Sequence, residues 1–213
     1  MLHEGCVSER LLTLLRKLEG ETVFKDYFLV RGTALALQLG HRISVDIDLF
    51  TQKELNIPEI TGYLAQNHSK KYQLLNSQKM IYQVMIEGIK VDFVHHPFEL
   101  VEPVYHDNQI KYLGIKDIAA MKLHAIETSG NRAKDFVDIY FLLREMPLKK
   151  MFKYYKKKYS TDNIFNAKRS LSFFDDVPDE SWKEIRIIGK KVTVVTVKKT
   201  ILNAIQEFNE EKL

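Results

Sequence analysis

The alternating segment VDIDL at residues 45–49 strongly limits what this chain can fold into. Successive side chains of a β-strand point to opposite faces, so the alternation predicts a strand over residues 44–50. In this strand Val45 faces the core with the other apolar residues, while Asp46 and Asp48 share the opposite face. Two neighbouring carboxylates disfavour joint ionisation unless a cation neutralises them. The segment therefore predicts a sheet with a cation site on one face.

A Gly-Thr pair precedes this strand. Gly32 and Thr33 follow an expected strand over residues 24–30 and open an expected helix over residues 33–39. The first amide N–H groups of a helix lack partners within that helix, and together with the positive end of its dipole they bind phosphate. Carboxylates and substrate phosphates are the oxygen ligands that usually hold Mg²⁺. The two segments together suit a nucleoside triphosphate and its metal ion.

A third carboxylate lies in a second alternating segment, residues 89–95. Val91 and Phe93 share the expected core face, which leaves Asp92 on the other face. If this strand lies beside residues 44–50, Asp92 can join the first two carboxylates as a metal ligand, or as the base that deprotonates an attacking hydroxyl. The alternative is that these aspartates only form a solvated strand face, and the residues alone leave both interpretations open.

Hydrophobic periodicity and turn signals predict the other elements. Residues 7–18, with Ser8 as a cap, and the Asn56-Ile57-Pro58 segment predict two helices in the first half of the chain. Strands are expected at residues 72–75, 80–86 and 89–95, with a hairpin at Glu87-Gly88, and helices at residues 116–126, 133–144, 147–155, 164–174 and 192–208. The sequence thus predicts an α/β domain over residues 1–113 and a helical domain over residues 114–213.

Composition limits the class of protein. Hydrophobic residues make up 45% and charged residues 28% of the chain, which indicates a folded protein rather than a disordered one. No apolar run approaches the ~20 residues that span a bilayer, so no membrane partner is expected. The single cysteine, Cys6, excludes an internal disulfide and fits a reducing, cytoplasmic location. The formal charge of +4 permits an anionic partner without requiring one.

The segment GTALALQLGHRISVDIDLF, residues 32–50, resembles the signature of the AbiEii/AbiGii-type nucleotidyltransferases. These are minimal relatives of the DNA polymerase β superfamily, and many act as toxins of toxin–antitoxin systems. Residues 116–143 and 170–178 resemble two further blocks of the family, so the likeness covers most of the chain. It implies an α+β fold, in which a nucleotidyltransferase-like mixed sheet with flanking helices is followed by a C-terminal helical domain.

The resemblance assigns roles to the residues of the first blocks. It implies that Asp46, Asp48 and Asp92 are catalytic and hold Mg²⁺, and that Gly32 and Thr33 bind the triphosphate of an NTP. The residue patterns described above are compatible with these roles.

Further roles are implied for Lys122, Asp135 and Arg42. Lys122 matches the family's triphosphate-contacting lysine, and Asp135 matches its essential acidic partner. Lys122 lies on an apolar helix stripe, a poor place for an unpaired ammonium, so the alternative is a structural ion pair with Asp135 or Asp138. Arg42 lies in the loop beside the first two aspartates, where it either holds phosphate or balances the carboxylates.

Arg31 is a departure from the family pattern. The family usually has two glycines before the threonine, whereas this chain has Arg31-Gly32. We expect the side chain of Arg31 to turn away from the site, which leaves the backbone amides of Gly32 and Thr33 available for phosphate. An inward side chain would instead block the phosphate site.

The resulting functional prediction is transfer of an NMP group from an NTP to an RNA acceptor, such as tRNA, or to a protein acceptor, with Mg²⁺ as cofactor. The resemblance also implies a toxin role with a cognate antitoxin protein as partner. The alternative is a catalytically silent nucleotide- or RNA-binding module on the same scaffold. The basic, tyrosine-containing residues 149–159 either follow an RNA backbone or form a solvated helix face.

Overall fold

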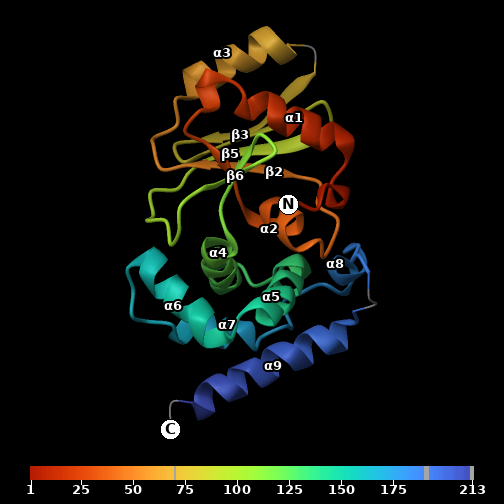
Figure 1. Ribbon diagram of the computed structural model, residues 1–213, viewed down its shortest axis with the longest axis vertical. Helices are drawn as coiled ribbons and strands as arrows, with labels where there is room; N and C mark the ends of the chain where they lie inside the picture. The colour runs from red at the N-terminus through yellow and green to blue at the C-terminus, as the bar shows by residue number, and fades with distance from the viewer. Residues whose placement is uncertain (70, 190–191, 212–213) are drawn as a thin grey trace. The chain divides into compact units, whose positions relative to one another are not determined.

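The computed structural model describes residues 1–69, 71–189 and 192–211 of the 213-residue chain (Figure 1). The chain forms two compact units. The first comprises Met1–Gln38, Ser44–Phe98 and Val104–Leu113, and the second comprises Leu39–Ile43, Glu99–Pro103 and Gly114–Leu213. Two short segments that the expected division at residue 113 places in the first domain, residues 39–43 and 99–103, thus group with the second unit.

A mixed sheet is the frame of the first unit. Among the described residues it has seven strands in the order β3-β4-β5-β2-β1-β7-β6. The strands are β1 (Phe28–Leu29), β2 (Ile47–Thr51), β3 (Tyr72–Gln78), β4 (Ile81–Ile86), β5 (Ile89–His95), β6 (Tyr105–Asp107) and β7 (Ile110–Tyr112). The central strands β2 and β5 are parallel, and the other neighbours of these two, β1 and β4, pair with them antiparallel. The expected α+β class is confirmed.

Three helices flank this sheet within the described part of the first unit: α1 (Glu9–Glu19), α2 (Arg31–Leu39) and α3 (Ile57–His68). Figure 1 shows α1 and α3 on one side of the sheet and α2 on the other. Ser8 caps α1 by accepting a hydrogen bond from the Leu11 amide, and Asn56 caps α3 in the same way through the Glu59 amide. Both caps confirm the helix starts predicted from the sequence.

The apolar face of the two central strands is buried against an aromatic cluster. Ile47 and Leu49 of β2 lie opposite Val91 and Phe93 of β5, and all four are fully buried. Phe24, from the short 3-10 turn Thr22–Phe24, stacks on Phe93 with ring centroids 4.9 Å apart. Because side chains alternate along a strand, this burial fixes the aspartates of β2 and β5 on the opposite face.

The start of β2 differs from the prediction. We expected a strand over residues 44–50 with Val45 in the core, but the strand begins at Ile47 and Val45 is 67% exposed. The physical reason lies in the backbone partners of the preceding loop. Ser44 donates its N–H to the carbonyl of Cys6, and Ile43 donates its N–H to the carbonyl of Arg186, so these residues do not join the sheet.

Short strands account for the other differences. The strand expected over residues 24–30 is reduced to β1, and the β6–β7 hairpin was not predicted. Each strand of this hairpin has only three residues, too few for an alternation to be visible. The longer β4–β5 hairpin is confirmed, and its turn residues Glu87 and Gly88 have φ values of 53° and 79°.

The second unit is helical, as predicted. Its helices are α4 (Ile115–Thr128), α5 (Ala133–Glu145), α6 (Leu148–Tyr159), α7 (Phe165–Leu171), α8 (Asp179–Lys183) and α9 (Val194–Glu210). Helix α4 packs against α5, α6 and α7, and α9 packs against α5 and α6. The short helix α8 was not predicted from the sequence. None of the helices in the described ranges has both the length and the apolar character needed to cross a membrane.

A buried ion pair joins α4, α6 and the segment of residues 99–103. Lys158 Nζ lies 2.7 Å from Asp117 Oδ1, and both side chains are fully buried. Asp117 also accepts hydrogen bonds from the amides of Val101 and Glu102, and Lys158 donates to the carbonyl of Glu99. Two buried charges are thus satisfied by each other and by backbone, which fixes this segment to the helices.

Replacing Lys158 tests the structural role of this pair. In Lys158→Met the carboxylate of Asp117 stays buried without its counter-ion, so we expect the free energy of unfolding to fall by about 3–5 kcal/mol. Urea denaturation followed by circular dichroism measures the change. Lys156→Met is the matched control, because Lys156 lies on the same helix in an exposed pair with Asp162. Equal losses in the two variants would contradict the prediction.

Candidate functional site

Asp48 and Asp92 are direct neighbours on the parallel strands β2 and β5. Their Cα atoms are register partners, so both side chains project from the same face of the sheet. The side chain of Asp48 is 13% exposed and that of Asp92 is 4% exposed. We call these two residues the carboxylate pair. The predicted convergence of Asp48 and Asp92 on one face is therefore present in the structure.

Arg31 contacts the carboxylate pair. Its Nη1 atom lies 2.9 Å from Asp48 Oδ1 and 3.9 Å from Asp92 Oδ2. The guanidinium carbon is 4.8 Å from the centre of the Phe50 ring, two residues after Asp48 on the same strand face. The expectation that this side chain turns away from the site is wrong, because two carboxylates and an aromatic ring attract the guanidinium inward.

The backbone of Arg31 has a conformation that favours glycine. The residue stands where β1 gives way to α2, and its φ is 57°, in the left-handed region. Residues with a Cβ rarely adopt this conformation, whereas glycine adopts it without steric cost. The strand-to-helix turn thus demands a glycine-like backbone, and this chain meets the demand with an arginine.

Lys90 and Gln83 hold Asp92, and neither was predicted as a site residue. Lys90 Nζ lies 2.8 Å from Oδ1 and 2.9 Å from Oδ2, and Gln83 Nε2 donates to Oδ2 at 2.8 Å. Although Lys90 is near, Oδ1 is buried and accepts no well-aligned hydrogen bond from the described part of the chain. The sequence held a signal for both partners, since Lys90 precedes Asp92 by two strand positions and Gln83 faces it across the hairpin.

Thr33 holds the loop that carries Asp46. Its hydroxyl donates to the backbone carbonyl of Asp46 and lies 2.9 Å from the Ser44 hydroxyl. The Thr33 side chain is buried, so its hydroxyl serves the loop. The backbone amides of Gly32 and Thr33 lie in the first turn of α2, and their phosphate-binding role stays a prediction. Asp46 is half-buried and directly precedes β2.

The chemistry of the carboxylate pair fits a hard divalent cation. Two carboxylates on neighbouring strands, one with a buried oxygen that lacks an aligned donor, offer the oxygen ligands that Mg²⁺ prefers. The described residues contain no group of three or more His, Cys, Asp or Glu side chains spaced to hold a metal ion. The joint metal role of Asp46, Asp48 and Asp92 therefore stays a prediction.

Within the second unit, Lys122 is bound to two aspartates. Its Nζ lies 2.7 Å from Asp135 Oδ1 and 2.6 Å from Asp138 Oδ2, and the lysine side chain is only 6% exposed. Arg132 binds the other oxygen of Asp135 through Nε and Nη2. The ion pairs considered as an alternative for Lys122 are thus present. Its triphosphate contact and the catalytic role of Asp135 stay predictions.

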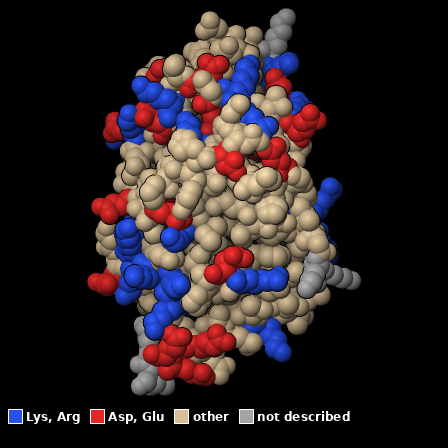
Figure 2. All heavy atoms as spheres, viewed as in Figure 1, with Lys and Arg blue, Asp and Glu red and all other residues tan. Residues whose placement is uncertain are grey.

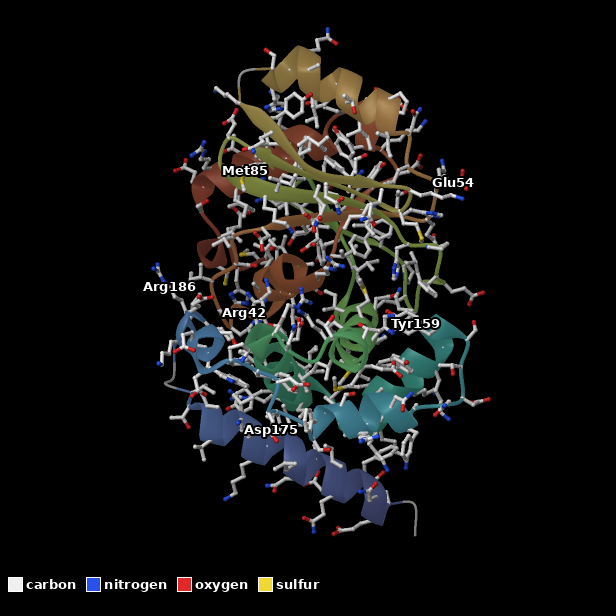
Figure 3. The ribbon with its side chains drawn as sticks, turned by 180° about the vertical axis from the view of Figure 1, so that it is seen from behind. Arg42, Glu54, Met85, Tyr159, Asp175 and Arg186 are labelled. Atoms are coloured by element: carbon white, nitrogen blue, oxygen red, sulfur yellow. The ribbon has the colours of Figure 1, made fainter. Side chains whose placement is uncertain are left out.

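Asp138 is the centre of a buried cluster. Arg42 binds it through two nitrogens, at 2.7 Å and 3.0 Å, and His41 Nε2 lies 2.8 Å from Oδ1. Figure 3 labels Arg42 near Arg186, and residues 41–43 pair by backbone with residues 186–188. The Asp138 cluster, as we name it, contains Asp138, Asp135, Lys122, Arg42, Arg132 and His41. Sequence analysis missed the central role of Asp138 and of its partner His41.

The charges of the Asp138 cluster do not cancel. Burial alone raises the pKa of Asp138, but the positive charges of Arg42 and Lys122 outweigh it and hold the pKa well below its usual range. Burial also lowers the pKa of His41 and outweighs the attraction of Asp138, which acts in the opposite direction. The imidazole of His41 therefore favours its neutral form. Three cations then face two carboxylates, which leaves one net positive charge in the cluster.

The predicted site residues fall into two groups, each within its own unit. The first unit contains Gly32, Thr33, Asp46, Asp48 and Asp92, and the second contains Arg42, Lys122 and Asp135. Inside each unit the residues lie together as described above. The predicted approach of Lys122 and Asp135 to the carboxylate pair stays a prediction.

The fold is similar to those of solved proteins. MenT4, a nucleotidyltransferase toxin from Mycobacterium tuberculosis H37Rv, aligns with a TM-score of 0.62 and 13% identity over 94% of this chain and 82% of its own. JHP933 from Helicobacter pylori aligns with a TM-score of 0.50 and 16% identity over 97% and 96% of the two chains. At these identities the comparisons establish the likeness of the fold.

Sequence comparison identifies the family. An uncharacterized protein of Aquifex aeolicus (strain VF5) is 32% identical over 182 residues, which cover 84% of this chain and 88% of the relative. The family model described as nucleotidyl transferase AbiEii toxin, type IV TA system, matches residues 14–188, a range that includes both groups of site residues. The chain therefore belongs to the AbiEii family of nucleotidyltransferase toxins.

Proposed function

We propose that this nucleotidyltransferase moves an NMP group from an NTP to a hydroxyl of an RNA or protein acceptor, with Mg²⁺ as cofactor. The observation that carries the proposal is the carboxylate pair, held side by side on parallel strands at the face where α2 begins. Membership of the AbiEii family makes the chain a nucleotidyltransferase of toxin–antitoxin type. The identities of the metal ion, of the nucleotide donor and of the acceptor are our proposals beyond this family membership.

The start of α2 is the proposed triphosphate site. The first amides of a helix attract phosphate, and Gly32 lets a phosphate approach the backbone closely. Val30, which directly precedes α2, donates its N–H to the carbonyl of Asp48, so the first turn of α2 begins beside the strand residue that carries this carboxylate. A triphosphate at these amides would have its α-phosphate near the carboxylates.

Each residue of the first unit then has a role. Asp48 and Asp92, joined by Asp46, would hold Mg²⁺, which supplies positive charge against the charge that develops on the phosphates. The acceptor hydroxyl attacks the α-phosphorus, the bond to the β-phosphate oxygen breaks, and pyrophosphate leaves. Asp92 serves as a ligand or as the base that takes the hydroxyl proton. The contribution of the protein is mainly positioning and charge neutralisation.

The second unit is proposed to supply positive charge to the triphosphate. Lys122 has three N–H donors, and in the described structure two carboxylates occupy it. The single net positive charge of the Asp138 cluster suits an anion, and Lys122 is the family's triphosphate lysine by resemblance. Arg42 binds Asp138 with its forked guanidinium, which supports a role in holding the cluster together.

The proposed partners are an acceptor and an antitoxin. Candidate acceptors are tRNA, other RNA or protein, and a reaction with NTP and RNA places the protein in the cytoplasm. Figure 2 shows mixed charges over the upper part of the visible face, with a group of Lys and Arg side chains at the lower left and a group of Asp and Glu side chains below it. In α6, Tyr155 and Lys158 are buried. Of the two interpretations of residues 149–159, this burial supports a partly solvated helix face rather than a continuous RNA-binding face. A cognate antitoxin follows from the family.

A catalytically silent nucleotide-binding module is the second candidate. The observation that favours it is the contact of Arg31 with both members of the carboxylate pair. Family membership and the presence of every predicted site residue favour the enzyme.

Asp48→Asn tests the proposed reaction. The protein is incubated with each labelled NTP, Mg²⁺ and total cellular RNA and protein, and label in each fraction is measured. Because the substitution removes a charged metal ligand, we expect incorporation to fall by roughly 100-fold or more. Asp26→Asn is the control, since Asp26 is an exposed aspartate of the same unit paired with Lys53. Incorporation that survives Asp48→Asn, or is absent from the wild type with all four NTPs, speaks against the proposal.

Lys122→Met separates a binding role from a structural one. The Asp138 cluster loses a buried cation, so we expect a fall of about 3 kcal/mol in the free energy of unfolding. If Lys122 also contacts the triphosphate, NTP affinity falls at least tenfold, by ~1.4 kcal/mol. Calorimetry with Mg²⁺ and NTP measures the affinity at a temperature where circular dichroism shows the variant to be folded.

Lys158→Met is the matched control for this comparison. It also removes a buried cation of the second unit, but its partner is Asp117 rather than the Asp138 cluster. We expect Lys158→Met to lose stability and keep its NTP affinity. If the two variants bind NTP equally well, the role of Lys122 is limited to its ion pairs.

A further inference from the structure

We propose that Arg31 is a resident cation of the carboxylate pair, which a divalent metal ion must displace in order to bind. The inference rests on the proposed metal role of Asp48 and Asp92. It gives Arg31 a role of its own at the carboxylate pair, and it makes metal binding depend on a movement of that residue.

The first argument is that both cations would use the same two carboxylates. Arg31 Nη1 is 2.9 Å from Asp48 Oδ1 and 3.9 Å from Asp92 Oδ2, so the guanidinium bridges the two carboxylates. Mg²⁺ binds carboxylate oxygens at about 2.1 Å. A metal ion held by Asp48 and Asp92 would compete with the guanidinium for these carboxylates, because the two positive charges would repel each other.

The second argument is that each carboxylate of the pair already has a cation of the protein beside it. Lys90 Nζ is within 2.9 Å of both oxygens of Asp92, and Arg31 supplies the partner of Asp48. The charges of Asp48 and Asp92 are thus offset by two cations of the protein itself before any metal ion arrives. The pair attracts a divalent ion less strongly in this state than two bare carboxylates would.

The third argument is that the side chain of Arg31 is partly exposed. Its side chain is 37% exposed, in contrast to the nearly buried carboxylate of Asp92. It extends from the first residue of α2, where the helix amides attract phosphate. A guanidinium released from Asp48 can bind phosphate oxygens through two parallel hydrogen bonds. An incoming triphosphate would therefore compensate for the contacts that Arg31 loses, so metal and nucleotide bind best together.

Three substitutions separate charge from backbone conformation. Arg31→Gly removes the charge and suits the positive φ of 57°. Arg31→Ala also removes the charge but keeps a Cβ in the left-handed region. Arg31→Lys keeps a charge at the same backbone position. If the charge controls metal binding, the glycine and alanine variants behave alike and differ from the lysine variant.

Binding of Mn²⁺, as a probe for Mg²⁺, is measured without nucleotide by calorimetry and by electron paramagnetic resonance. We expect Arg31→Gly and Arg31→Ala to bind Mn²⁺ at least tenfold more tightly than the wild type, a difference of ~1.4 kcal/mol. Arg31→Lys should remain close to the wild type. Asp48→Asn in the Arg31→Gly background should abolish the gain. Thermal unfolding in EDTA checks that each variant is folded.

The outcomes distinguish this inference from the proposed function. Equal Mn²⁺ affinity in the wild type, Arg31→Gly and Arg31→Ala, with binding lost in Asp48→Asn, overturns the role of Arg31 and leaves the metal site intact. A gain in Arg31→Gly alone assigns the effect to the backbone and also overturns it. If no variant binds Mn²⁺, or if Asp48→Asn leaves Mn²⁺ binding unchanged, the proposed metal site is contradicted. The inference about Arg31 then fails as well.

Discussion

The parallel pairing of β2 with β5 is the constraint on which the rest of the first unit depends. It places Asp48 directly beside Asp92, and it does so because the alternate residues of both strands are buried against Phe24 and its aromatic neighbours. A slip of one residue in either strand would turn its aspartate into the core. The packing of apolar side chains on one face therefore determines which charges meet on the other.

Asp48, Asp92 and the carboxylates of the Asp138 cluster are paired with cations of their own unit. Asp48 and Asp92 receive Arg31 and Lys90, whereas the buried carboxylates of the second unit receive Lys122, Arg42 and Arg132. Buried charges cost free energy unless they are paired, so each cluster helps to define its own surroundings. The residues proposed for the chemistry thus also make ion pairs within the fold, so we expect a substitution at most of them to change both activity and stability.

Sequence reasoning succeeded where a local pattern carried the information. The caps at Ser8 and Asn56 and the faces of Asp48 and Asp92 follow from spacing alone. It failed for Val45, because distant backbone partners of the preceding loop decide where β2 begins. It also failed for the direction of Arg31, since no sequence pattern shows that two carboxylates and Phe50 would surround this guanidinium. Both failures arise from contacts with distant segments that have no counterpart in the local spacing of residues.

The grouping of residues 39–43 and 99–103 with the second unit has a consequence for how the chain can be divided. The polypeptide passes between the units at 38/39, 43/44, 98/99, 103/104 and 113/114. A fragment cut after residue 113 would lose Arg186, whose carbonyl accepts the Ile43 amide, and Asp117, whose carboxylate accepts the Val101 amide. A fragment that contains the sheet and its aspartates alone would therefore lack part of the hydrogen bonding of the whole chain. The connection from α2 to Asp46 in particular uses Arg186 of the second unit as a backbone partner.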